Sequence, residues 1–303
     1  MTALAPRTAP RSVADIRAER RRYAAKLPRR KVRISLLLPA IIIVAVAIFV
    51  PPLTAFDPIQ TSGPASTAPN GIHWFGTDSA SLDIFARTVA AARYNLSIAF
   101  AATVLCTAIG VVFGVVIGSL ESERSLGGLA ARGTTRLFDL LQAIPGILIG
   151  LVIVTFFGAS ITSLAVGTAI ILAPVQMRLV RIEVLRVRKE AYLDAARMSG
   201  QTELQLMLRH VMPNSVWVAL ENMSFLFAAS MLLTAALGFV GVGLQPPTPE
   251  WGSMLSSATN DALSGRWWPA AFPAAALMIT VWAFANASHA LFGRPEGASA
   301  GGH

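Results

Sequence analysis

Long apolar runs alternate with short polar segments along most of this chain. Six runs are long enough to cross the hydrocarbon core of a bilayer, and they lie near residues 34–56, 95–119, 137–157, 161–180, 215–240 and 269–292. Because a chain in lipid has to satisfy its backbone hydrogen bonds internally, such runs form helices. The pattern predicts an all-α integral membrane protein with six transmembrane helices.

The composition supports the same class of protein. Hydrophobic residues make up 54% of the 303 positions and charged residues only 14%, and the mean hydropathy is +0.59. These values exclude an ordinary soluble domain. We expect a first membrane helix at 34–56, an external segment at 57–94 and a five-helix membrane core at 95–292.

Positive charge is concentrated in two parts of the chain. Eleven of the 25 Lys and Arg residues precede residue 34 and seven more lie between Arg178 and Arg209, whereas the segments 57–94 and 241–268 contain only Arg87, Arg93 and Arg266. Basic residues concentrate on the cytoplasmic side of membrane proteins. We therefore expect the basic arm 1–33, the polar loop 183–214 and the tail 293–303 to be cytoplasmic. The basic residues behind the net charge of +9 are then expected to determine the orientation of the chain in the membrane. Membrane lipids rather than nucleic acid are the expected partner of the arm.

The residues needed for several chemistries are missing. Cys106 is the only cysteine, and the four histidines are scattered without carboxylate or thiol groups at ligand spacing, so no metal site is expected. The sequence contains no G-x-x-x-x-G-K-[ST] phosphate loop and no nucleophile, base and orienting group at recognisable spacing. We expect neither catalysis nor a cofactor bound by this chain. If ATP drives its function, ATP and Mg²⁺ bind to another polypeptide.

The polar loop 183–214 interrupts the apolar pattern with two short predicted helices. The first carries a stripe of small apolar side chains, at Ala191, Ala195, Ala196 and Met198. Gly200 supplies the left-handed backbone that ends it, Thr202 is the expected N-cap of the second helix, and Pro213 is expected to interrupt that helix. A stripe of alanine lets another protein's surface come close, although an ordinary loop on the membrane surface explains these residues as well.

This loop resembles the EAA loop of bacterial ABC importer permeases, whose pattern is E-A-A, a glycine some residues later, then a hydrophobic residue and proline. The matching residues are Glu190, Ala191, Ala195, Ala196, Gly200 and Pro213. In that family the loop forms a coupling helix that inserts into a groove of the ATPase subunit. The resemblance therefore implies that these residues transmit movement from an ATPase.

Two further segments resemble the C-type permeases of dipeptide and oligopeptide importers. From Phe75 the chain reads FGTDSASLD, similar to F-G-T-D-x-x-G-R-D, and from Leu237 it reads LGFVGVGLQPPTPEWGSML, similar to L-S-F-L-G-L-G-x-Q-P-P-x-P-x-W-G-x-M-L. The matching residues are Gly76, Asp78, Asp83, Gly241, Gly243, Pro247, Trp251 and Gly252. Ser81 and Leu82 depart from the pattern, because the family has Gly-Arg there. Trp251 is expected to help seat an amphipathic helix at the outer membrane interface.

Three positions inside the apolar runs are candidates for a pathway or a structural role. Asp139 lies about one turn inside its run, where an ionised side chain is costly, and is expected to reach Arg136 or a neighbouring chain. Pro145 is expected to kink the third span. Glu221 lies about two turns into the fifth span. A stand-alone ion-coupled carrier or channel, the alternative hypothesis, would use Asp139 and Glu221 as its functional residues.

The resemblance covers about residues 74–286 and implies the type I ABC importer permease fold in the plasma (inner) membrane of a bacterium. It implies a second, B-type permease that completes the pathway, two ABC ATPase subunits, and an extracytoplasmic substrate-binding protein that delivers dipeptides or oligopeptides. Nickel and haem are the alternative substrates, because related permeases serve them too.

Overall fold

The computed structural model describes residues 34–121 and 126–292, whose helices belong to one compact unit. The expectations for the arm 1–33 and the tail 293–303 lie outside the described residues. The helices are α2 (Ile34–Phe49), α3 (Ile84–Leu120), α4 (Leu126–Ala143), α5 (Gly146–Phe157), α6 (Ile161–Val187), α7 (Ala191–Met198), α8 (Glu203–Leu206), α9 (Met212–Phe239), α10 (Trp251–Ser257), α11 (Thr259–Leu263) and α12 (Trp268–Phe292), with short turns η1 (Pro51–Leu53) and η2 (Met207–Val211). Within the described ranges only isolated β-bridges occur and no strand. The prediction of an all-α fold is confirmed.

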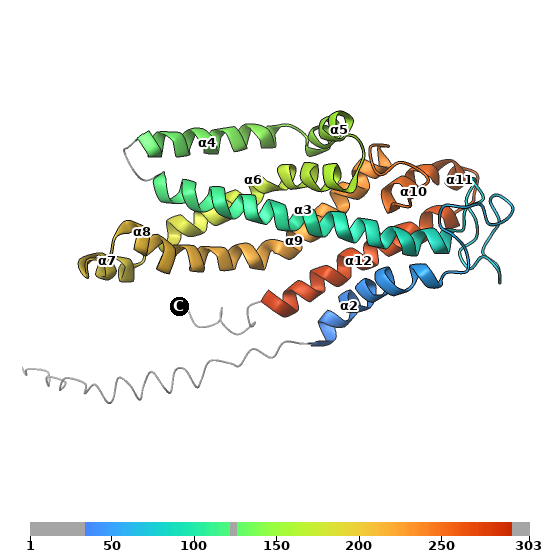
Figure 1. Cartoon of the computed structure of the whole chain (residues 1–303), viewed down its shortest axis with the longest axis horizontal. Coiled ribbons are helices and arrows are strands. Elements are labelled where there is room, and N and C mark those ends of the chain that lie inside the picture. Colours follow the sequence, from blue (N-terminus) through green and yellow to red (C-terminus); the bar gives the residue numbers. More distant parts are fainter. Residues whose placement is uncertain (1–33, 122–125, 293–303) are drawn as a thin grey trace, which may run out of the picture. The chain divides into compact units, whose positions relative to one another are not determined.

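Helices α3, α6 and α9 form the centre of this unit (Figure 1). Glycines of α3 face α6: a Cβ atom on Gly110 would stand 2.6 Å from the side chain of Gln176, and one on Gly114 would stand 2.7 Å from Cβ of Val180. Gly118 continues this contact one turn further on. Glycine at four-residue spacing thus lets the two backbones approach closely, and a larger residue would separate α3 from α6.

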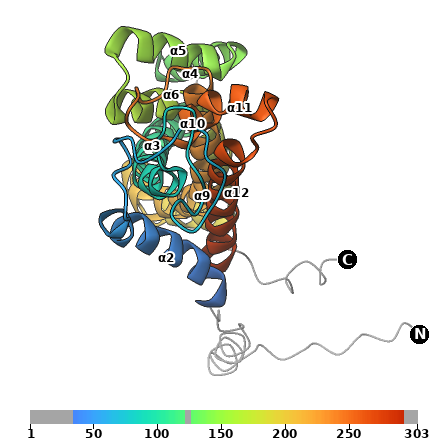
Figure 2. The same cartoon turned by 90° about the vertical axis from the view of Figure 1, so that its right-hand side faces the viewer.

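The remaining helices lie on two sides and at two ends of this centre. Helices α2 and α12 lie side by side on one side, and α4 and α5 lie on the opposite side (Figure 2). Helices α7 and α8 lie at one end, while α10, α11 and the segment 50–83 lie at the other end (Figure 1). The two sequence segments that resemble permease motifs on the expected outer side therefore meet far from the polar loop.

The expected count of six spans is not confirmed. Four helices of the described ranges are long and apolar enough to cross a membrane, and the bent pair α4 and α5 makes a fifth if it counts as one span. Helix α2 has 16 residues, or about 24 Å, against about 30 Å of hydrocarbon. It ends at Phe49 rather than near residue 56 because Pro51 and Pro52 lack the N–H groups that would continue it.

The third expected span is broken rather than kinked. Helices α4 and α5 meet at an angle of 91°, and Pro145 is the N-cap of α5. Proline cannot donate to the preceding turn, and its ring disfavours helical backbone just before it. Sequence analysis predicted the position of the bend but not its size, because the angle depends on how α5 packs against α6 and α9.

Helix α3 begins at Ile84, so its first turns lie within the segment 57–94 that is expected to be external. Asp83 is its N-cap and accepts a hydrogen bond of 2.8 Å from the backbone N–H of Ala86. Helix α3 has 37 residues, or about 55 Å, so it extends beyond a hydrocarbon core of about 30 Å. Its first turns are therefore available to hold the segment 50–83.

Candidate coupling segment and outer joint

Helix α7 follows the end of α6 after a sharp turn at Glu190. Glu190 is the exposed N-cap of α7 with extended backbone (φ −74°, ψ 131°), and its side chain makes no capping hydrogen bond. Only three residues separate the last residue of α6, Val187, from Ala191. The connection between α6 and α7 is therefore short.

Leu193 attaches α7 to the rest of the protein. Its side chain is fully buried in a cluster with residues of α6, α8, η2 and α9, namely Val180, Val184, Val187, Leu206, Val211 and Ala219. Burying one leucine side chain is worth roughly 1.5–3 kcal/mol. The helix is thus held by one apolar anchor on its inner face.

The opposite face of α7 is open and has small side chains. Ala191, Ala195 and Met198 are exposed, and 85% of the Met198 side chain is accessible. Ala196 is half-buried and packs against the Leu193 cluster. The expected stripe of four residues is therefore a stripe of three, because position 196 turns toward the α6 side.

Gly200 ends α7 with left-handed backbone, as predicted (φ 85°). Its N–H donates to the carbonyl of Arg197 at 3.0 Å, and the N–H of Gln201 donates to the carbonyl of Ala196 at 3.3 Å. This pair of bonds is the Schellman motif. Because a Cβ atom at Gly200 would meet nothing within 4 Å, the glycine serves the backbone and not internal packing.

Helix α8 begins at the predicted cap. Thr202 accepts from the N–H of Gln205, and the Gln205 side chain accepts from the N–H of Thr202, which forms a capping box. Arg197 lies 2.8 Å from both Asp194 and Glu203. Hydrogen bonds from Arg197 to Glu203 and Asp194 raise the pKa of Arg197, so it stays cationic and ties α7 to α8.

Pro213 does not interrupt the second helix, and this prediction is wrong. It lies in the first turn of α9, directly after the π-helical turn η2. Proline lacks an N–H, and its ring crowds the carbonyl four positions earlier. The π-helical turn is wider than an α-helical turn and leaves room for Pro213. The path from Glu203 to Phe239 consequently counts as one long helix.

Arg181 of α6 and Arg188, the C-cap of this helix, hold its end against the end of α3. Arg181 makes two bonds with Glu121, at 2.5 and 2.6 Å, and Arg188 donates to the carbonyl oxygen of Ser119 at 2.6 Å. Paired bonds between an arginine and a carboxylate fix orientation as well as distance. The base from which α7 projects is therefore braced by ionic and hydrogen bonds.

The membrane carboxylates have local partners. Asp139 pairs with Arg178 of α6 at 2.7 Å and not with Arg136 as expected, because the side of α4 that carries Asp139 lies toward α6. Glu221 accepts a hydrogen bond of 3.0 Å from the indole of Trp217, one turn earlier. The structure does not bring the two carboxylates into one site.

A polar bridge at the centre of the helices was not predicted from the sequence. Gln176 of α6 is fully buried and donates to the carbonyl oxygen of Ala219, at 2.9 Å, while Asn222 donates to the side-chain oxygen of Gln176, at 2.7 Å. Such bonds between helices stabilise packing in a membrane. A glutamine inside an otherwise apolar run was the available signal.

At the other end, the two motif segments form one joint. Arg87 of α3 is buried and donates to the carbonyl oxygen of Pro247, at 3.3 Å, while its Nε atom lies 3.8 Å from Asp78. Trp251 donates its indole N–H to the carbonyl oxygen of Thr88, at 2.9 Å. Trp251 is buried and α3 supplies its polar partner, so this side chain holds α10 against α3; the position of α10 relative to the membrane interface stays a prediction.

The backbone of the 75–83 segment explains its glycine and its departure from the family pattern. Gly76 has a φ of 77° and no room for a side chain beside Trp268. Ser81 has a φ of 64°, a left-handed conformation that glycine adopts without strain. Asp83, besides capping α3, lies 2.8 Å from Nδ1 of His73, so this segment is fixed to the helix start.

Glu250 is a second residue that sequence analysis missed. It is fully buried, caps α10, and accepts bonds of 2.8 Å from the N–H groups of Gly252 and Ser253. Burial raises the pKa of Glu250, while the two backbone bonds act in the opposite direction. A Cβ atom on Gly243 would lie 2.9 Å from the Glu250 carboxylate, so glycine makes room for this cap.

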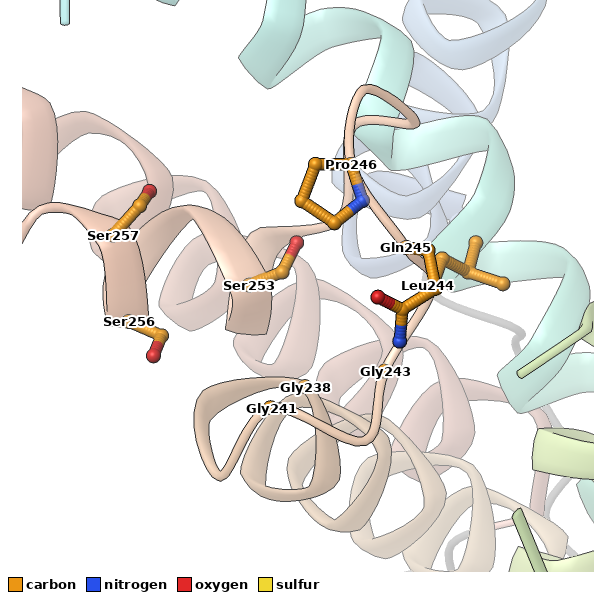
Figure 3. A pocket seen from close by; sticks show the side chains of 9 residues that line it. All are labelled: Gly238, Gly241, Gly243, Leu244, Gln245, Pro246, Ser253, Ser256 and Ser257. Atoms are coloured by element: carbon orange, nitrogen blue, oxygen red, sulfur yellow. The ribbon is translucent and has the colours of Figure 1, made fainter. Parts of the chain in front are cut away.

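A cavity of about 220 Å³ lies beside this cap (Figure 3). Gly241, Gly243 and Gln245 form part of its lining, and Ser253 and Ser256 of α10 approach it from the other side. A Cβ atom on Gly252 would collide with the backbone of Ala235 in α9. This glycine therefore serves helix packing and does not make room for a ligand. The motif residues thus build a packed turn beside a small recess.

The helical fold, the projecting α7 and the outer joint define a membrane permease. Residues 110–294 match the family described as the binding-protein-dependent transport system inner membrane component. The chain belongs to this family. It is thus a multi-pass inner membrane protein and a membrane subunit of a transport system.

Curated relatives support this assignment. A dipeptide transport system permease protein of Alkalihalophilus pseudofirmus is 34% identical over 243 residues, which cover 80% of this chain and 77% of the relative. A glutathione transport system permease protein of Pectobacterium atrosepticum is 31% identical over 272 residues, 89% of this chain and 88% of the relative. The resemblance to peptide importer permeases is confirmed, and a stand-alone ion-coupled carrier is not favoured.

Proposed function

We propose that this chain and a second, B-type permease form the pathway through which an ABC importer moves short peptides. An extracytoplasmic substrate-binding protein delivers the peptide to the end that carries the outer joint. The similarity to permeases named for dipeptide and glutathione transport supports a peptide substrate over nickel or haem. The bent pair α4 and α5 supports a role beside a pathway, since broken membrane helices are tolerated where they line a cavity.

Coupling to ATP takes place at α7. Two ABC ATPase subunits bind ATP and Mg²⁺, and a groove of one subunit receives the exposed stripe of this helix. The observation that carries this proposal is the contrast between the two faces of α7: Leu193 is fully buried, whereas Ala191, Ala195 and Met198 are open. A helix anchored on one face and smooth on the other suits insertion into a partner.

In this proposal two of the intramembrane candidates have structural roles and the third lines the pathway. Pro145 sets the break between α4 and α5, and Asp139 holds α4 against α6 through Arg178. Glu221 is half-buried beside Trp217 and lines the pathway. None of the three carries a coupling ion.

A transport assay tests this function. The assembled complex is reconstituted in vesicles with its binding protein, and uptake of a labelled dipeptide, glutathione, nickel and haem is compared with and without ATP. We expect ATP-dependent uptake of the peptides, lost in Ala195→Arg and retained in Ala130→Arg, a matched change at an exposed position of α4. Accumulation of nickel or haem without peptide would contradict the proposed substrate, and full uptake by Ala195→Arg would contradict the coupling site.

The orientation in the membrane needs its own test. In the proposed topology both termini and α7 are cytoplasmic and the outer joint faces outward. Because Cys106 is the only cysteine and is buried, a Cys106→Ser chain can carry single reporters at the exposed positions Ser79 and Ser199. A membrane-impermeant maleimide should label Ser79→Cys in intact cells and Ser199→Cys only in inside-out vesicles. The reverse pattern would invert the topology.

A further inference from the structure

A long apolar groove runs beside α2, on the side of the molecule away from α4 and α5. Its first part is a cavity of about 410 Å³, between α2, α3, α9 and α12, lined by Val44, Ala47, Ile48, Phe100, Phe227 and Phe284. Its second part is a cavity of about 400 Å³. Val44 and Phe284 line both parts, so the two cavities are adjacent sections of one groove.

The groove has the length of one membrane leaflet. Its wall on α2 extends from Leu37 to Ile48, a rise of about 16 Å at 1.5 Å per residue. One leaflet supplies half of a hydrocarbon core of about 30 Å. The volume of each cavity lies within the range of about 300–1,000 Å³ that is usual for small-molecule sites, so an extended acyl chain fits the space.

One end of the groove carries a single positive charge. Arg93 lines the first cavity together with Ser97, one turn further along α3, and it is exposed. The other arginines of the segments 57–94 and 241–268 are paired, Arg87 with Asp78 and Arg266 with Asp261. Among the residues that the structure describes, no carboxylate lies within ion-pairing distance of Arg93.

The position of Arg93 corresponds to the level of lipid phosphates. The apolar run of α3 begins near residue 95, so Arg93 stands where hydrocarbon gives way to head groups. Arginine keeps its guanidinium at this level while its stem lies along apolar surface, and its planar fork matches phosphate oxygens. The charge of the site is thus complementary to a phosphate and its walls to a fatty acyl chain.

We propose that this groove binds a phospholipid. Arg93 and Ser97 hold the head-group phosphate, and one acyl chain lies along α2, past the stacked rings of Phe227 and Phe284, whose centroids are 4.2 Å apart. The bound lipid fills the space between α2 and the central helices. Since α2 is short for a membrane helix, the lipid also fixes its position against α3 and α9.

Photolabelling of the assembled complex tests this site. The complex is placed in vesicles of phosphatidylethanolamine and phosphatidylglycerol, doped with a phosphatidylglycerol that carries a diazirine in its acyl chain, and labelled peptides are mapped by mass spectrometry. We expect label on α2 and near Phe100 and Phe227. In Arg93→Gln the labelling at limiting probe should fall about tenfold, the effect of one charge-assisted hydrogen bond, whereas Arg93→Lys should retain most of it.

A second pair of variants tests the groove independently of the charge. Val44→Trp places a large ring in both cavities and should reduce labelling, whereas Ile42→Trp, at an exposed position of α2 that lines neither cavity, should leave it unchanged. Labelling that ignores both Arg93→Gln and Val44→Trp would overturn the proposal. So would label that appears on a partner permease and not on α2 or near Phe100 and Phe227.

Discussion

The guanidinium of Arg197 lies 2.8 Å from the carboxylate of Glu203, so one ion pair joins α7 to α8 across the turn at Gly200. Arg188 at the end of α6 lies 3.5 Å from the same carboxylate. Glu203 of α8 therefore pairs both with Arg188 at the end of α6 and with Arg197 of α7. These ion pairs tie the end of α6, α7 and α8 together.

The turn at Gly200 gives the first prediction. Gly200→Pro should leave the chain in the membrane but abolish ATP-driven uptake, because proline fixes φ near −65° and removes the N–H that bonds to Arg197. Gly200→Ala should cost only about 1 kcal/mol, the strain of a left-handed alanine. Uptake by reconstituted complexes measures the effect. Gly133→Ala, at another glycine with open space around it, is the control, and unchanged uptake by Gly200→Pro would exclude a role in coupling.

Ser81 gives a prediction on stability. Ser81→Gly should stabilise the protein by about 0.5–1 kcal/mol, because the left-handed backbone at this position strains any residue with a Cβ atom. The midpoint of thermal unfolding in detergent is the measurement. Ser79→Gly, in the same turn but without a positive φ, should give no gain. Equal shifts for the two variants would show that backbone strain is not the cause.

Glu250 gives a prediction on pH. Burial raises its pKa above the ordinary value of 4.5, so between pH 4.5 and the raised value the folded protein holds a proton that the unfolded chain has released. Stability then falls as the pH rises through this window and levels off above it. The contribution of Glu250 is therefore largest below about pH 4.5.

Comparison of two proteins isolates this effect. Unfolding midpoints of the unaltered protein and of Glu250→Gln are measured at a series of pH values, since glutamine does not titrate. The difference between the two should favour the unaltered protein more strongly at low pH than at neutral pH. A difference that grows as the pH rises would mean that the backbone bonds from Gly252 and Ser253 outweigh burial.

Features that depend on a few neighbouring residues were predictable from the sequence. The left-handed Gly200, the cap at Thr202 and the bend at Pro145 each follow from the chemistry of one residue, and the structure has all three. Glycine at four-residue spacing from Gly110 to Gly118 is likewise a local signal of close helix packing. The local pattern determines these features almost alone.

Features that depend on distant partners were not predictable. The partner of Asp139 is Arg178, 39 positions later, and Trp251 turns inward because the carbonyl of Thr88, 163 positions earlier, accepts its hydrogen bond. Gln176 and Glu250 are buried because other helices cover them.

The docking of α7 on an ATPase is tested most directly by a photo-crosslinker at Met198, which is 85% exposed. Benzoylphenylalanine at position 198 of the assembled complex should cross-link to a polypeptide that contains a phosphate-binding loop, and this product should be lost when Ala195→Arg is added. The same crosslinker at Leu129, an exposed position of α4, should not give it. Cross-links from position 198 only to lipid, in a complex that still hydrolyses ATP and transports, would contradict the account.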